Sequence, residues 1–114
     1  FLYELMANIY KNAKADLTAN TATTVYTVPS DSRSIVKSII VSEDSGNADT
    51  ITLTITDASS NVFSLFKTKA VSANATVELL SQPLVLQESE ILKATAATAN
   101  RLHIVVSVLE INRS

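Results

Sequence analysis

Apolar and polar residues alternate along several short segments of the chain, which is the pattern of β-strands with one buried face. The clearest segment, residues 51–56, reads Ile-Thr-Leu-Thr-Ile-Thr and places three large aliphatic side chains on one face and three threonines on the other. Residues 102–109 also alternate but become apolar on both faces towards their end. We therefore expect residues 102–109 to form a central strand, or one that a neighbouring subunit covers.

A third segment, residues 33–42, is rich in β-branched residues, and strict alternation places Ile35 on the same face as Ile39 and Val41. Turn-forming Asp, Asn and Ser residues separate the segments, because the chain has a single glycine. Weaker strand patterns occupy residues 9–17, 24–28, 62–69, 76–80, 84–86 and 91–97. This spacing predicts an all-β fold, an antiparallel, jelly-roll-like β-sandwich of about eight strands.

The length of 114 residues fits one domain, which we place at residues 23–114. Residues 6–22 contain only three large apolar residues besides Met6, so we expect an extended N-terminal arm and a linker that reaches a neighbouring molecule. Residues 1–5 precede the only methionine, Met6, and we interpret them as a non-native or extension segment.

The composition argues against several classes of binding partner. The nine basic residues are scattered and the formal net charge is -2, so the chain has no basic cluster that could follow a nucleic-acid backbone. No apolar stretch approaches the ~20 residues of a membrane span. Without cysteine, neither a disulfide framework nor a thiolate metal site can form. We expect no nucleic-acid and no membrane partner.

Residues that could support catalysis are few. His103 is the only histidine, and we interpret it as a polar residue on the less buried face of its strand, because no partner that could orient it as a base is visible. One glycine cannot build a phosphate-binding loop. The sequence therefore predicts no catalytic residues, no cofactor, no small-molecule substrate and no enzymatic activity.

The sequence contains two groups of carboxylates, of which the first is a candidate for a calcium site. Glu43, Asp44 and Asp49 surround the glycine turn, but they lack the regular Asp-x-Asp-x-Asp spacing that gathers oxygens around calcium. We favour solvated loop carboxylates and no metal there. Glu88 and Glu90 are interpreted as loop charges that keep a sheet edge soluble. The aromatic residues are too dispersed for a platform that stacks bases or sugars.

Several strand and turn patterns together are more specific than simple alternation. Val-Tyr-Thr-Val-Pro precedes a Val/Ile-rich strand, and Leu-Val-Leu precedes an acidic turn and a strand that ends in small residues. The stretches are residues 25–29 with 33–41, residues 49–57, and residues 73–80 with 83–86 and 90–94. They resemble the small β-sandwich structural proteins of tailed-bacteriophage virions. Ser30 and Ser89 stand where that pattern usually has glycine.

The resemblance implies a structural protein that is made in the cytoplasm of the host bacterium and incorporated into the virion. Its partners would be further copies of itself and other virion proteins, such as the major capsid, neck or tail protein. Capsid decoration or cementing is the favoured role, and a neck, tail or fibre component is an alternative. A carbohydrate-binding or host-adhesion module is a further alternative, because β-sandwiches often present loops to sugars. The resemblance brings no catalytic residues with it.

Overall fold

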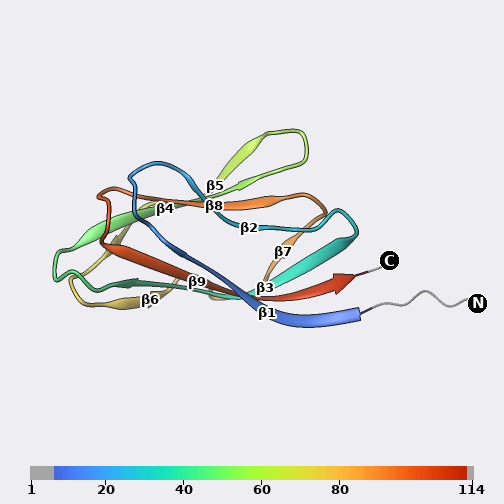
Figure 1. Cartoon of the computed structure of the whole chain (residues 1–114), viewed down its shortest axis with the longest axis horizontal. Coiled ribbons are helices and arrows are strands. Elements are labelled where there is room, and N and C mark those ends of the chain that lie inside the picture. Colours follow the sequence, from blue (N-terminus) through green and yellow to red (C-terminus); the bar gives the residue numbers. More distant parts are fainter. Residues whose placement is uncertain (1–6, 113–114) are drawn as a thin grey trace, which may run out of the picture.

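Residues 7–112, which a computed structural model describes, form nine strands in two antiparallel sheets that face each other (Figure 1). This arrangement confirms the predicted all-β sandwich. No helix long and apolar enough to cross a membrane occurs in this part of the chain. The strands are β1 (Ala7–Asp16), β2 (Thr23–Thr27), β3 (Ser32–Glu43), β4 (Asp49–Thr56), β5 (Val62–Val71), β6 (Thr76–Glu78), β7 (Leu84–Leu86), β8 (Ile91–Ala96) and β9 (Leu102–Asn112).

The two sheets have five and four strands. The larger has the order β1-β9-β3-β6, and β7 also pairs with β3, whereas the smaller has the order β2-β8-β4-β5. β9 lies between β1 and β3 and pairs with both along nearly its whole length. It is the central strand that its two-sided apolar pattern predicted.

The core fills the space between the sheets, and the strand patterns identify most of it. In β9, Leu102, Ile104 and Val106 are fully buried, and in β4 so are Ile51 and Leu53. The alternation along these two strands therefore predicts the inward-facing side chains correctly. The opposite side of β4 carries partly exposed threonines, as expected.

The inward face predicted for β3 is wrong in one part. A register shift between Val36 and Ser38 places an extra residue in β3 opposite β9. Such a bulge inverts the alternation beyond it. The buried aliphatic side chains of β3 are therefore Val36, Ile39 and Val41, and Ile35 faces outward.

The segment predicted as an arm and linker, residues 6–22, is described from residue 7 onward. There β1 pairs with β9 through ten consecutive residues, and Leu17 is fully buried in the core. The backbone ladder, rather than apolar side chains, holds this segment in the chain's own sheet. The proposed extension at residues 1–5 lies outside the described residues.

Asn and Ser take over the role of glycine in several turns. The single glycine, Gly46, has a φ of 82°. Ser89 has a φ of 66°, so the turn before β8 keeps the left-handed conformation that favours glycine, the residue usual at this place in the phage pattern. The other non-glycine residues with positive φ are Ser60, Thr68, Asn74 and Asn100. The Asx- and Ser-based turns expected from the low glycine content are confirmed.

A charge in the core should unfold the sandwich. Val106→Asp places an unpaired carboxylate among fully buried residues, and we expect it to lower the free energy of unfolding by about 4 kcal/mol or more. Thr52→Asp is the control, because Thr52 is only partly buried and an Asp oxygen could still accept the hydrogen bond from the Thr68 N–H. Chemical denaturation measures both, and equal losses would contradict the assigned core.

Candidate functional site

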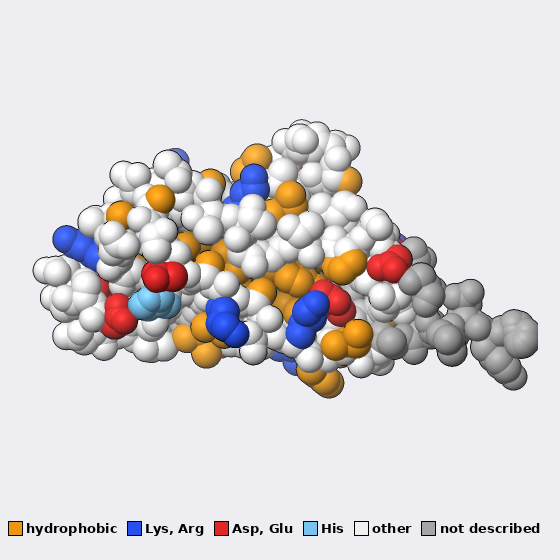
Figure 2. Space-filling model, in the orientation of Figure 1, with side chains coloured by type: hydrophobic (Ala, Val, Ile, Leu, Met, Phe, Trp, Pro, Cys, Tyr) orange, Lys and Arg blue, Asp and Glu red, His pale blue; other side chains and the backbone are white. Residues whose placement is uncertain are grey.

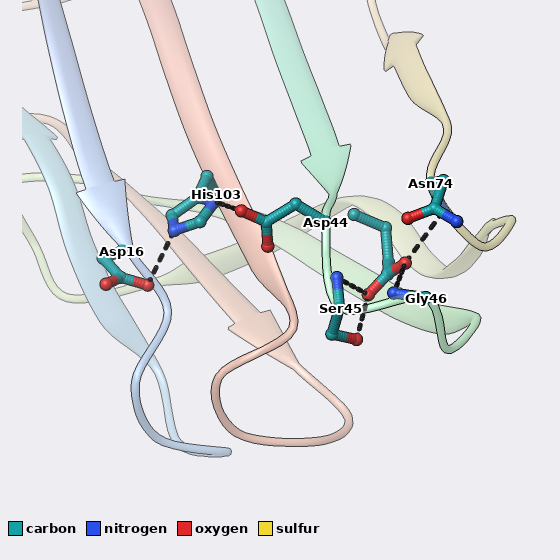
Figure 3. A network of polar contacts seen from close by, with 7 residues as sticks. Asp16, Asp44, Ser45, Gly46, Asn74 and His103 are labelled. Atoms are coloured by element: carbon teal, nitrogen blue, oxygen red, sulfur yellow. Dashed lines mark hydrogen bonds and ion pairs between the residues drawn. The ribbon is translucent and has the colours of Figure 1, made fainter.

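His103 lies between two aspartates at one end of the larger sheet (Figure 3). Its Nε2 is 3.2 Å from Oδ1 of Asp16, and its Nδ1 is 3.5 Å from Oδ2 of Asp44. Asp16 is the register partner of His103 on β1, and Asp44 follows the end of β3 on the other side of β9. These partners could not be predicted from the sequence, because only the pairing of β9 with both strands brings the three residues together.

The depression beside His103 offers an imidazole but no hydroxyl or thiol nucleophile. The shallow depression beside it is lined by Lys14, Ala15, Asp16, Ile104 and Val105, none of which carries a hydroxyl or thiol group. The His103 side chain itself is 42% exposed, and both aspartates are more exposed. Within residues 7–112, no group of three or more His, Cys, Asp or Glu side chains could hold a metal ion. The geometry is that of an exposed polar contact that holds the end of β1 to β9.

Glu43 is almost fully buried at the turn between β3 and β4, with 2% of its surface exposed. Its carboxylate accepts hydrogen bonds from the hydroxyl and backbone N–H of Ser45 and from the backbone N–H groups of Gly46 and Asn74 (Figure 3). Burial by itself raises the pKa of the Glu43 carboxyl, but these hydrogen bonds outweigh it and lower the pKa to about 2. Glu43 joins the turn after β3 to the turn before β6.

The three carboxylates considered for calcium therefore have three different sets of partners. Glu43 accepts hydrogen bonds from donors in the turns. Asp44 faces His103, and Asp49 accepts a hydrogen bond from the Thr98 N–H at 3.1 Å. The interpretation as solvated loop carboxylates is wrong for Glu43 and Asp49, because both are buried. Their oxygens satisfy backbone N–H groups that the turns leave without a partner in a strand.

A second buried polar cluster links the two sheets near the other end of β9. The Tyr26 hydroxyl on β2 donates to Oε2 of Glu110 at 2.5 Å and lies 2.6 Å from Oγ of Ser34. Nζ of Lys11 lies 3.2 Å from the same Glu110 oxygen. Burial raises the pKa of the Tyr26 phenol, and the hydrogen bond to Glu110 raises it further, so the group stays protonated near neutral pH. The cluster is suited to hold β1, β2, β3 and β9 together, not to transfer protons.

The outer face of the larger sheet carries apolar side chains in register. Tyr10 of β1 pairs with Leu109 of β9, Leu109 pairs with Ile35 of β3, and Ile35 pairs with Val85 of β7. These four residues form a row across four strands, which we call the outer apolar row. Its two ends are widely exposed, Tyr10 at 74% and Val85 at 61%. The bulge in β3 turns Ile35 outward into this row.

More apolar surface lies close to the row. Val105 of β9 pairs with Ile40 of β3 on the same outer face, and both remain about one-third exposed. In Figure 2, hydrophobic side chains (orange) are also visible in the strip between the two sheets, on the side of the edge strands β1 and β2. Exposed, contiguous apolar surface is typical of interaction sites. The candidate functional site is therefore this surface, not a catalytic pocket.

Comparison with known proteins places the fold. No protein-family model and no curated protein matches the sequence. A solved structure of Bacillus endospore appendages, described as disulfide-linked pili, matches 98% of this chain and 92% of its own chain at 10% identity and a TM-score of 0.60. The capsid structure of Helicobacter pylori bacteriophage KHP30 matches 96% of this chain and 95% of its own chain, at 15% identity and a TM-score of 0.55.

The chain shares its fold with β-sandwich proteins of a phage capsid and of spore pili. The capsid asymmetric unit of cyanophage Pam1 is a more distant structural match, with a TM-score of 0.40 and 21% identity. The match covers 96% of this chain and 86% of the Pam1 chain. At identities this low the likeness is one of fold.

The buried charge of Glu43 makes a pH-dependent contribution to stability. Its pKa in the folded chain, about 2, lies below the ordinary value of 4.5, so the contribution is complete above pH 4.5 and is lost as the pH falls towards 2. We expect Glu43→Gln to destabilise the protein at pH 7 and to approach the wild type near pH 2. Urea unfolding at several pH values measures this difference.

Glu88→Gln is the matched control, because Glu88 forms an ion pair with the exposed side chain of Arg33 and we expect that pair to contribute less than about 1 kcal/mol. A difference between Glu43→Gln and wild type that does not change with pH would contradict the assigned role of the Glu43 carboxylate.

Proposed function

We propose that the chain is a structural protein of a tailed-phage virion, with capsid decoration or cementing as its favoured role. The observation that carries this proposal is the outer apolar row. One face of the larger sheet already packs in the core, and the row lies on the other face. Burying such surface contributes about 2.5 kcal/mol per ~100 Å² before the costs of association. The function is then stabilisation by packing, without chemistry.

The composition supports a virion over a pilus. The two solved structures described above with TM-scores of 0.60 and 0.55 belong to assemblies, a pilus and a phage capsid. The pili are described as disulfide-linked, whereas this chain contains no cysteine and cannot form such links. The strand patterns that resemble phage virion proteins point the same way. A neck, tail or fibre component would use the same surface and is the second candidate.

The carbohydrate-binding alternative has less support from the surface. Sugar-binding platforms need aromatic side chains close together, but exposed Tyr10 lies on β1 of the larger sheet and exposed Phe63 on β5 of the smaller one. The shallow depression beside His103 is lined without any aromatic ring other than the imidazole. We therefore place the function in protein–protein packing.

Two valines with equal exposure provide a matched test. Val85 lies in the outer apolar row and is 61% exposed, and Val62 lies on β5 of the smaller sheet and is 62% exposed. We expect Val85→Lys to fold normally but to reduce binding to virus particles by about tenfold or more, because the contact would then bury a charge. Val62→Lys should bind as the wild type does.

The measurement is co-sedimentation of each purified variant with particles of the phage that encodes the chain, prepared without this protein. Mass spectrometry of complete particles provides the independent check that the protein is a virion component. The proposal fails if the wild type is missing from complete particles. Equal binding of Val85→Lys and Val62→Lys would show that the outer apolar row is not the binding surface.

A further inference from the structure

β1 is a free edge of the larger sheet. Among residues 7–112 it pairs only with β9. The Leu17 N–H donates to the Leu102 carbonyl at 3.0 Å, and the Leu17 carbonyl accepts from the Asn100 N–H at 2.9 Å. Odd-numbered residues of this segment therefore direct their backbone groups towards β9, and even-numbered residues direct theirs away. Unpaired N–H and C=O groups at Asn8, Tyr10, Asn12 and Lys14 face outward.

The other edges of the two sheets are short or irregular, and β1 is neither. β2 has a register shift between Thr24 and Tyr26, β5 has two shifts and a positive φ at Thr68, and β6 and β7 have three residues each. β1 has ten residues in one register, without proline or glycine. Sheet edges are usually protected by bulges, proline or charges. One of its two lysines, Lys11, is turned inward to Glu110.

We propose that two copies of this chain join by antiparallel pairing of β1 with β1 of the second copy, around a two-fold axis at Asn12. This inference rests on the proposed function, since it names one contact of the assembly. A register centred on Asn12 places Tyr10 opposite Lys14 of the second copy, where an ammonium group can lie over an aromatic ring. It places Asn8 opposite Asp16. In this register no like charges face each other. Even-numbered residues of one copy lie opposite even-numbered residues of the other, so their outward N–H and C=O groups can form hydrogen bonds.

Neighbouring registers are less favourable. Centring the pair on Lys11 or on Lys14 places each lysine opposite its own copy, which is destabilising. Centring it on Ala13 brings the two Lys14 side chains to neighbouring diagonal positions. The charges of β1 thus favour the register centred on Asn12 over these three.

The paired strands would also extend the outer apolar row. The row ends on Tyr10 in β1, at the edge where the second copy would add its own sheet. A two-fold axis along the sheet normal keeps the outer faces of both copies on the same side. Strand pairing would then join the copies, and the combined apolar face would be presented to the rest of the particle.

A single cysteine tests the register, because the chain has none of its own. Residue 12 would face residue 12 of the second copy at a Cα separation of about 5.5 Å, within the range for a disulfide. We expect Asn12→Cys to form mostly covalent dimer under mild oxidation, seen by non-reducing electrophoresis. Ser64→Cys, exposed on edge strand β5, is the matched control and should stay largely monomeric.

Proline variants test the backbone contact itself. Asn12→Pro removes an N–H that faces away from β9, so the monomer should fold while self-association through β1 is lost. Ala13→Pro removes an N–H directed towards β9 and should destabilise the monomer. Equal cross-linking of Asn12→Cys and Ser64→Cys, or dimers of Asn12→Pro as stable as those of wild type, would overturn the inference.

These outcomes separate this inference from the proposed function. If Asn12→Pro behaves as wild type while Val85→Lys no longer binds particles, the outer apolar row alone makes the assembly and the β1 contact is wrong. If the wild type neither binds particles nor occurs in them, the proposed function fails whatever the cysteine variants do.

Discussion

The antiparallel ladder of β1, β9 and β3 is the constraint on which the rest of the structure depends. β9 pairs with β1 through ten residues and with β3 through eleven, so the alternation of β9 determines which side chains of three strands face inward. Inward residues meet the smaller sheet and form the core. Within residues 7–112, outward residues have no second sheet to pack against, and the apolar ones include the outer apolar row. The same ladder thus produces both the stability of the domain and the surface that we propose for association.

The polar clusters are consequences of this ladder rather than separate sites. His103 meets Asp16 and Asp44 because β9 brings the ends of two neighbouring strands to it. Tyr26 and Glu110 close the other end of the sandwich. Two surface features of residues 7–112 that the fold itself does not use are the apolar outer face of the larger sheet and the free edge of β1. Both are features of proteins that associate.

Local alternation was enough to predict the strands and the inward faces of β4 and β9, because each pattern lies within one segment of the chain. It failed in β3, where the bulge at Lys37 exists only relative to β9. Three further features could not be predicted from the sequence alone: the partners of His103, the burial of Glu43 and the outer apolar row. Each depends on which residues of distant strands lie opposite one another, and alternation carries no information on register. The absence of nucleic-acid and small-molecule partners remains a prediction.

Sedimentation velocity of the unmodified protein tests the central claim, that its function is association through an exposed sheet surface, most directly. Across concentrations from about 1 μM to about 100 μM, where contacts of moderate affinity form, the account predicts a sedimentation coefficient that rises from the monomer to a defined dimer or larger oligomer. A coefficient that stays at the monomer value throughout, with or without added virus particles, would contradict it.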